Sequence, residues 1–510
     1  MLPDRAASTD WARIAREKTA ARDLPGALDA WQQALADNPA SLDIAGELAA
    51  LAFRLGQWDM AEKFYAHLIT HGRQDAATLA SYAAALREQM RFDEAADLLR
   101  TVAQQRPGEA VLWEGLGAVM QARGDRDTAL VFYGEALRLD PGYLNARFLR
   151  GCVLLEKGET LAALKDLTAC AADFRDPDNR ASAAITCAYA FLSIGDLTDG
   201  WHWYDARAKT GTVHEVMYDL RLRRWRGDAV TGKRLFVSAE QGLGDEILFA
   251  SLLPEIAADV AALGIAVQPR LVPLFRRSFP DAEVIAHKTE TRDGRIRRGF
   301  PGLAGRYDAW ALMGDFLKTR RARVDAFPAH NDFLVPDPAR AAHWRDYLAG
   351  LGDGPKAGLL WKSLKGSTVR NASFSAFAQW QGVLATPGVR FINLQYGDTA
   401  AELAEAEAAG IALHTPQGID LKNDLDDLAA LCRALDLVIG PSNATTNLAA
   451  ACGADVWLIA PARTWAALGQ ANYPWYPQAR LFACPEPGAW DAVMAEVAAA
   501  LAAFSAPCRD

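Results

Sequence analysis

The sequence predicts an all-α repeat array followed by an α/β module. Small residues recur at a fixed interval through the first two fifths of the chain. Beyond Arg226, short apolar runs alternate with amphipathic segments, which is typical of parallel sheets wrapped by helices. With 510 residues, the chain is also long enough for several domains of about 100–200 residues each.

The repeat is clearest at alanines that lie 34 residues apart, which are Ala27, Ala61, Ala95, Ala129 and Ala163. Small side chains at such positions let two antiparallel helices approach each other closely. Glycines fall where the first helix of a pair must turn into the second, because positive φ costs glycine little. These glycines are Gly56, Gly124 and Gly158, and the second helices end near Pro39, Pro107 and Pro141.

This spacing and pattern resemble tetratricopeptide repeats (TPR). The resemblance predicts a curved helical solenoid over residues 1–214, with a degenerate sixth unit from Ala181 to Arg207 capping the stack. We expect the concave groove of the solenoid to bind a peptide or a protein. A rigid spacer and a dimerisation surface are the alternatives that the sequence leaves open.

The first α/β unit follows Arg226-Gly227-Asp228. Residues 233–239 are predicted to form a buried strand, residues 240–245 a glycine-rich loop, and a helix is expected to start near Glu246. In such a unit, the glycines let the backbone approach a ligand, and the N-terminus of the helix favours anionic ligands. The loop lacks the GxGxxG pattern with a following acidic residue, so a nicotinamide dehydrogenase is disfavoured.

A second series begins near Pro355. The expected strands are residues 357–361, 389–394, 436–440 and 455–459, and the expected helices are residues 374–384, 400–409, 424–435, 444–451 and 490–504. The two series separate between Asp337 and Gly354. The pattern therefore predicts two Rossmann-like domains, at residues 228–340 and 355–510, facing each other across a cleft.

Composition narrows the classes of function. The net charge of −9 disfavours a nucleic-acid binder. The sequence contains no run of 18 apolar residues, so no membrane span is predicted. The charged N-terminus does not resemble a signal peptide, and a cytoplasmic protein is therefore expected. The scattered cysteines and the absence of HExxH predict reduced thiols and no metal site. Two arginine clusters are either solvated faces or phosphate contacts: Arg221, Arg223, Arg224 and Arg226, then Arg295, Arg297 and Arg298.

Residues 239–249 (AEQGLGDEILF), preceded by Gly200-Trp201, Tyr204 and Arg207, resemble bacterial TPR proteins that carry a GT-B glycosyltransferase module. Such modules are related to the heptosyltransferase-like family 9. Further similar segments are residues 393–398, 434–439, 447–453, 475–477 and 480–482. Flagellin glycosyltransferases are among these proteins, and in them the TPR part holds the flagellin.

The resemblance implies a metal-independent, inverting transferase without a cofactor. Its nucleotide-sugar donor would bind mainly to the C-terminal half, and its protein acceptor would lie in the TPR groove. For the flagellin type, the acceptor would be flagellin Ser or Thr, and the donor a CMP-linked nonulosonic acid. The oligomeric state is not predicted.

The candidate base is Asp245, which matches the aspartate that heptosyltransferase-like enzymes use to deprotonate the acceptor. Its place beyond Gly242 and Gly244, at a helix start, would expose it to the cleft. A carboxylate that caps the helix is the alternative interpretation. Glu240 is the alternative base.

Candidate donor-binding residues follow strands of the second series. Lys362, Lys365 and Arg370 would neutralise the donor phosphate, unless their loop is merely a solvated surface. Phosphate could also be held at a helix N-terminus by Ser442, Asn443 and Thr445, for which ordinary helix capping is the alternative. The base or ribose would meet Gln395 and Tyr396 at the carboxyl end of a strand.

The sequence departs from the family at one loop. Heptosyltransferase-like enzymes tend to have Asp and then Thr or Ser there, with His further along, where this chain has Ser442, Asn443 and Asn447. The departure argues against a heptose donor. It also motivates an alternative function, a non-catalytic TPR adaptor with a degenerate, nucleotide-binding GT-B domain. The nearby Trp465, Trp475 and Tyr476 are expected to pack in the core, and stacking on a sugar is the alternative.

Overall fold

The computed structural model describes residues 10–208, 216–240, 242–292, 295–300, 302–303, 305–329, 332–362, 374–486 and 488–505. The chain divides into two compact units. The first comprises Met1–Cys187 with Ala206–Tyr218 and Thr289–Arg298, and the second comprises Ala188–Asp205, Asp219–Lys288 and Gly299–Asp510. No helix in the described ranges is both long and apolar enough to cross a membrane.

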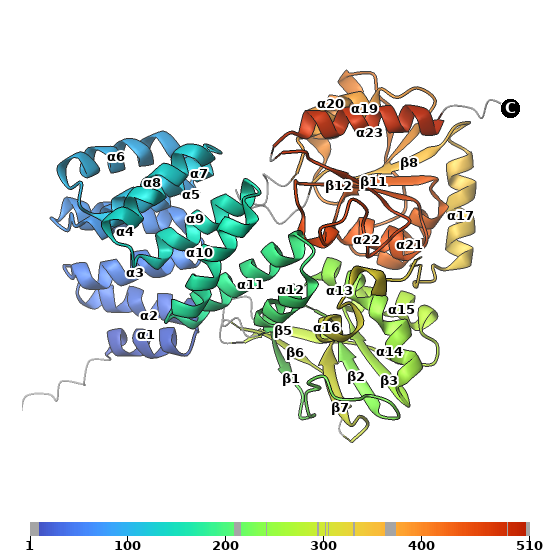
Figure 1. Cartoon of the computed structure of the whole chain (residues 1–510), viewed down its shortest axis with the longest axis horizontal. Coiled ribbons are helices and arrows are strands. Elements are labelled where there is room, and N and C mark those ends of the chain that lie inside the picture. Colours follow the sequence, from blue (N-terminus) through green and yellow to red (C-terminus); the bar gives the residue numbers. More distant parts are fainter. Residues whose placement is uncertain are drawn as a thin grey trace, which may run out of the picture. The chain divides into compact units, whose positions relative to one another are not determined.

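The first unit consists mainly of antiparallel helix pairs, drawn in blue to teal in Figure 1. The pairs are α1 (Trp11–Ala20) with α2 (Leu24–Asp37), α3 (Leu42–Arg54) with α4 (Trp58–Thr70), α5 (Ala76–Glu88) with α6 (Phe92–Gln105), α7 (Ala110–Ala122) with α8 (Arg126–Leu139), and α9 (Leu144–Glu156) with α10 (Thr160–Asp173). The predicted TPR-like array of helical repeats is confirmed.

Close packing explains the small residues of the repeat. The recurring alanines Ala27, Ala61, Ala95, Ala129 and Ala163 are all fully buried. A Cβ on Gly117 of α7 would lie 2.6 Å from the ring of Tyr133 on α8, so this pair of helices requires glycine there. The ring fills the space between the helices, and its hydroxyl donates to Gln121 Oε1 at 2.9 Å.

The turn between the two helices of each pair holds a residue with positive φ. The five φ values are 67° at Arg22, 71° at Gly56, 63° at Met90, 85° at Gly124 and 79° at Gly158. These positions follow the 34-residue repeat. The left-handed residue ends the first helix and reverses the chain, as in Gly56, whose amide donates to Phe53 O at 3.0 Å. Two repeats therefore carry a side chain where glycine is the least strained residue.

The second unit contains two parallel sheets. The strands of the first are β2 (Arg234–Ser238), β3 (Ala262–Val267), β4 (Glu283–Ala286) and β7 (Ala309–Leu312), in the order β4-β3-β2-β7. All three strand pairs are parallel. The helices that accompany this sheet are α13 (Leu243–Phe249), α14 (Leu253–Asp259), α15 (Val272–Ser278) and α16 (Leu317–Arg320).

The second sheet has six strands, which are β8 (Lys356–Leu359), β9 (Arg390–Asn393), β10 (Leu413–His414), β11 (Leu437–Pro441), β12 (Val456–Ala460) and β13 (Arg480–Ala483). Their order is β10-β9-β8-β11-β12-β13, and every pair is parallel. The accompanying helices are α17 (Pro338–Ala349), α19 (Gln381–Leu384), α20 (Ala400–Ala408), α21 (Leu425–Ala434), α22 (Ala444–Ala451) and α23 (Trp490–Ser505).

Helices α19 and α23 cover one face of this sheet, and α21 and α22 lie on the other (Figure 1). Trp380 and Val383 pack with Val493 and Val497 of α23 over the buried strand residues. The predicted α/β character is confirmed, and helix α22 matches the expected span. The helix expected over residues 374–384 is shorter, because it begins as a 3-10 turn at Phe377–Trp380.

A small third sheet was not predicted. It consists of β1 (Val216–Asp219), β6 (Arg295–Gly299) and β5 (Lys288–Arg292), in that order. Strands β5 and β6 form a hairpin inserted between β4 and β7 in the sequence. Their many charged residues gave no apolar run, so the sequence offered no strand signal.

The boundary between the two units falls inside the degenerate sixth repeat, after Cys187. Residues Ala188–Asp205, which include helix α12 (Leu197–Tyr204), belong to the second unit. Trp201 is buried, donates its indole N–H to Arg321 O at 2.7 Å and meets the ring of Trp475 edge-on. A Cβ on Gly469 would lie 2.6 Å from Gly195 N, so the turn before α12 also packs against backbone. Large aromatic side chains thus anchor this segment in the α/β unit.

Candidate functional site

The predicted site residues follow the central strands of the two parallel sheets. Glu240 and Gly242 come after β2, and Ser442 and Asn443 come after β11. The strand order of each sheet reverses at this point, between β2 and β7 in one and between β8 and β11 in the other. Open parallel sheets bind ligands at the carboxyl ends of strands where the order reverses.

The first turns of α13 and α22 are in direct contact. A Cβ on Gly244 would lie 3.5 Å from Ala444 N, and Asn447 Nδ2 donates to Gly244 O at 3.2 Å. The glycine therefore permits the backbones of the two helices to approach. This contact brings the carboxyl-end edges of both sheets to one place within the second unit.

Asp245 lies at this contact. It is the third residue of α13 and half-buried. Its carboxylate charge acts on Tyr473, a side chain that is 1% exposed. Burial, and to a lesser degree the charge of Asp245, raises the pKa of Tyr473 to about 12. The carboxylate of Asp245 is therefore near enough to Tyr473 for its charge to act on the Tyr473 hydroxyl.

Tyr473 also contacts Ser442. Its hydroxyl oxygen lies 3.2 Å from Ser442 Oγ, and one of these two groups donates to the other. Ser442 is exposed, whereas Tyr473 is buried beneath it. Tyr473 was not singled out from the sequence, because it lies in an irregular segment with no motif around it.

Glu240 is placed differently from Asp245. It is 4% exposed, and its Oε1 accepts from the backbone N–H of Gly314, which follows β7, at 2.8 Å. The side chain thus ties together the loops after two adjacent strands. Of the two candidate bases, Asp245 is the more accessible.

The N-terminus of α22 is capped by its own loop. Asn443 Oδ1 accepts from Thr445 N at 2.9 Å and from Thr446 N at 3.2 Å, while Thr446 Oγ1 accepts from Asn443 N at 3.0 Å. The Thr445 side chain is buried. Two of the helix amides expected to meet phosphate are therefore occupied by Asn443.

Two buried polar atoms at this helix lack a hydrogen-bond partner among the described residues. They are Asn443 Nδ2, a donor, and Asn447 Oδ1, an acceptor on a side chain that is 4% exposed. Buried polar groups are rarely left unpaired, because each costs about 1–3 kcal/mol. Their position beside Gly244 and Ser442 is consistent with a polar ligand.

The basic loop after β8 is described only at its start. Lys362 Nζ forms an ion pair with Glu402 and donates to Asp398 O at 2.9 Å. Although burial acts in the opposite direction, the hydrogen bond from Lys362 helps to hold the pKa of Glu402 below its usual value. Lys365 and Arg370 lie outside the described residues.

Gln395 holds the strand ends in place. Its buried Oε1 accepts from the backbone N–H groups of Trp361 at 3.0 Å and Lys362 at 2.9 Å, and its Nε2 donates to Tyr396 O at 3.1 Å. The side chain thereby links the end of β8 to the end of β9. Tyr396 is half-buried at the same edge.

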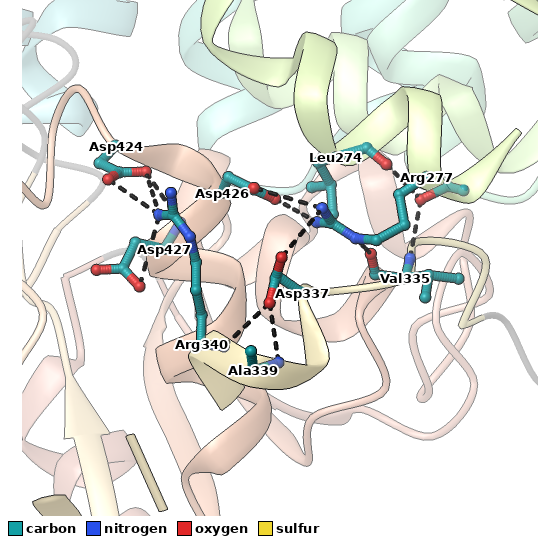
Figure 2. Close-up of polar contacts among 10 residues, drawn as sticks. Leu274, Arg277, Val335, Asp337, Ala339, Arg340, Asp424, Asp426 and Asp427 are labelled. Carbon is teal, nitrogen blue, oxygen red and sulfur yellow. Dashed lines mark hydrogen bonds and ion pairs between the residues drawn. The ribbon is translucent and has the colours of Figure 1, made fainter. Parts of the chain in front are cut away.

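Both parts of the second unit are joined by ion pairs that the sequence did not reveal (Figure 2). Arg277 on α15 pairs with Asp426 on α21, donates to Val335 O at 2.7 Å and lies 3.9 Å from Asp337. Nearby, Arg340 lies 3.1 Å from Asp424. The segment between the two sheets is thus fixed to both of them.

Two residues of the first arginine cluster form ion pairs within the chain. Arg223 pairs with Asp228, and Arg224 pairs with Asp315 and stacks over the Trp310 ring at 5.2 Å. The expected core packing of Trp475 and Tyr476 is confirmed, since both are fully buried. Trp465 is half-buried and stacks on Tyr189. Among the described residues, no group of three or more His, Cys, Asp or Glu side chains forms a metal site.

Comparison with known proteins gives one extensive match. The chain is 44% identical over 499 residues to Protein FlbA of Caulobacter vibrioides, covering 97% of this chain and 83% of that protein. No protein-family model matches the sequence.

Similar solved structures cover only part of the chain. TTC0263, a thermophilic TPR protein of Thermus thermophilus, is 21% identical and matches 34% of this chain and 96% of its own, with a TM-score of 0.31. A tetratricopeptide repeat protein from Parabacteroides merdae is 15% identical and matches 41% of this chain and 81% of its own, with a TM-score of 0.35.

Proposed function

This chain belongs to the family of Protein FlbA, and we propose that it is a protein glycosyltransferase with a GT-B module. In this proposal the two parallel sheets are the two Rossmann-like halves of the module. A nucleotide sugar binds at the second sheet, and the concave side of the TPR-like array holds the protein acceptor. The enzyme is metal-independent and inverting.

One observation supports the proposal most strongly. The carboxyl-end edges of the two sheets meet at the contact of α13 with α22, and the charge of Asp245 acts on Tyr473, which contacts Ser442. A transferase needs an acceptor-activating base opposite a donor site, and this arrangement supplies a carboxylate beside hydroxyl and amide groups.

The proposed chemistry is a single displacement. Asp245 accepts the proton of the acceptor hydroxyl, and the hydroxyl oxygen forms a bond to the anomeric carbon of the donor. The bond from that carbon to the nucleotide phosphate oxygen breaks, and the leaving phosphate takes the electron pair. Ser442 and Asn443 Nδ2 stabilise this phosphate, with Lys365 and Arg370 as further cationic groups.

The identity of the substrates follows from the resemblance alone. We propose flagellin Ser or Thr as the acceptor and a CMP-linked nonulosonic acid as the donor, in the cytoplasm. Tyr396 is the proposed contact to the nucleotide, and Gln395 supports it by joining the strand ends. Tyr473 acts as a positioning residue, because it is buried beneath Ser442.

Specific observations favour a second candidate, a non-catalytic adaptor. Asn443 caps the helix amides that would meet phosphate, and Lys362 is already paired with Glu402. In a degenerate nucleotide-binding domain, polar groups that once bound the ligand would instead bond to other groups of the same chain. This candidate predicts nucleotide or partner binding without sugar transfer.

Both candidate functions require a nucleotide-binding site. Stabilisation of the folded chain by a nucleotide tests whether that site exists. CMP, UDP, GDP and ADP are added in turn to the full chain, and the melting temperature is measured by fluorimetry. A ligand that binds only the folded state raises this temperature. We expect CMP to do so and Ser442→Ala to weaken the effect, while Asp281→Ala, an exposed carboxylate on the first half, leaves it unchanged. No shift with any nucleotide would contradict the donor site.

A further inference from the structure

An open pocket of about 510 Å³ lies at one side of the six-stranded sheet, beside β9 and the edge strand β10. It is lined by α19 and the segment after it, by the start of β9, and by the segment between α20 and β10. Small-molecule sites in proteins have volumes of about 300–1,000 Å³. The pocket is therefore large enough for a small organic ligand.

Three polar side chains line this pocket, and none of them forms a hydrogen bond or an ion pair with another described residue. Thr386, in the segment between α19 and β9, is 8% exposed. Arg390 is the first residue of β9, and its Nε is buried without a partner in the described ranges. His414 is the last residue of β10 and is half-buried. Because buried polar groups are seldom left unpaired, these side chains are candidates to bind a ligand.

Much of the remaining wall is apolar. Leu384, Val389 and Phe391 belong to the buried core beneath α19 and α23, and Ile411 packs against that core while partly exposed. Among the described residues, no Asp or Glu side chain lines the pocket. No carboxylate of the described chain therefore compensates the charge of Arg390 there, and a guanidinium group matches the geometry of carboxylate and phosphate groups. The pocket fits an anion that carries an apolar body.

The pocket is separate from the candidate donor site. Arg390 begins β9, whereas Gln395 and Tyr396 follow the carboxyl end of that strand. All strands of this sheet are parallel, so Ser442, which follows β11, lies at the same carboxyl edge as Gln395. The length of β9 therefore lies between Arg390 and the residues proposed to bind the donor.

We propose that this pocket is a second ligand site, which binds a small organic anion with an apolar body, either a carboxylate or a phosphate ester. The guanidinium of Arg390 pairs with the anionic group, and His414 and Thr386 donate hydrogen bonds to it. The apolar body lies against Phe391 and Ile411 and is removed from water there. The proposal does not depend on sugar transfer, because none of these residues belongs to the candidate donor site.

Methyl NMR of the full chain, labelled at the isoleucine methyl groups, tests the site directly. Ile411 lines the pocket, Ile439 lies on β11 near the candidate donor site, and Ile265 on β3 is the reference. The probes are phenyl phosphate, benzoate, inorganic phosphate and uncharged phenol. Phenyl phosphate or benzoate should shift the Ile411 signal saturably at millimolar concentration, while Ile265 stays unchanged. Phenol and inorganic phosphate should each bind at least tenfold more weakly, because each lacks one part of the ligand. The better of the two aryl anions identifies whether the site prefers phosphate esters or carboxylates.

Two arginine variants complete the test. Arg390→Met should weaken binding of the aryl anion at least tenfold, and it removes no polar contact between described residues. The matched control is Arg433→Met, at an exposed arginine of α21 that does not line the pocket, and it should leave the affinity unchanged. The second site is refuted if neither aryl anion shifts Ile411, if phenol shifts it equally, or if Arg390→Met keeps full affinity. Shifts at Ile439 without Ile411 would place the anion at the candidate donor site and would also overturn the proposal. None of these outcomes depends on transferase activity.

Discussion

Replacing Met90 with glycine is expected to stabilise the third repeat. Met90 has φ of 63°, and its side chain is 66% exposed, so the replacement loses little burial. The left-handed conformation costs an ordinary residue about 1–2 kcal/mol. Glycine removes that strain but makes the unfolded chain freer, which costs about 0.4–1 kcal/mol. The net gain is therefore about 0.5–1 kcal/mol.

Hydrogen exchange followed by mass spectrometry is the suitable assay, because repeat arrays open locally. The expected gain slows exchange in peptides from α5 and α6 about two- to fivefold, since a factor of ten corresponds to about 1.4 kcal/mol. The matched control is Gly124→Ala, at the same position of the next repeat, where φ is 85° and a Cβ would touch nothing within 4 Å. It should accelerate exchange in α7 and α8.

Opposite signs for these two variants are the essential result. If Met90→Gly accelerates exchange around its turn, the strain argument is wrong. If Gly124→Ala slows exchange, the turn does not require a left-handed residue. Met90→Ala keeps a Cβ and should change exchange little, which separates strain relief from loss of the methionine side chain.

Three further predictions concern the second unit. Arg277→Met should lower the free energy of unfolding, measured with urea, by about 2 kcal/mol, because it leaves Asp426 without its partner. The control is Arg323→Met, which breaks an exposed pair with Asp325 and should lower that free energy by at most about 0.5 kcal/mol. Gly440→Ala should lower the melting temperature through a loss of about 1–3 kcal/mol, since its Cβ would lie 2.9 Å from Leu360 O. The raised pKa of Tyr473, about 12, means that the folded state keeps a proton that the unfolded state loses above pH 10. Stability should therefore fall between pH 10 and 12, and less steeply in Tyr473→Phe. If stability fell equally steeply with pH in the unchanged sequence and in Tyr473→Phe, the burial of the Tyr473 hydroxyl would not be the cause.

The confirmed predictions depended on patterns within short stretches of the sequence. The strand, loop and helix around Ser442 were predicted because apolar periodicity changes sharply there, and α22 occupies the expected residues. The 34-residue period located the repeats through small residues that tight helix packing requires.

Features that depend on distant contacts were not predictable in the same way. The charged hairpin β5–β6 carries no apolar run, and its pairing with β1 depends on residues far along the chain. Tyr473 belongs to the candidate site because it contacts Ser442, which lies 31 residues earlier in the chain. The repeat period shows that Arg22 occupies a glycine position, but its ion-pair partner Asp178 lies 156 residues further along the chain.

The most direct test of the proposed function is the intact mass of the acceptor. Flagellin is incubated with the full chain and a CMP-linked nonulosonic acid, and its mass is compared between the unchanged sequence and Asp245→Asn. The account predicts a mass increase of whole sugar residues with the unchanged sequence and none with Asp245→Asn, although that variant still binds CMP. An equal increase with both would contradict Asp245 as the base. No increase with CMP-, UDP- or GDP-linked sugars, while the nucleotides still bind, would contradict transfer itself and favour the adaptor.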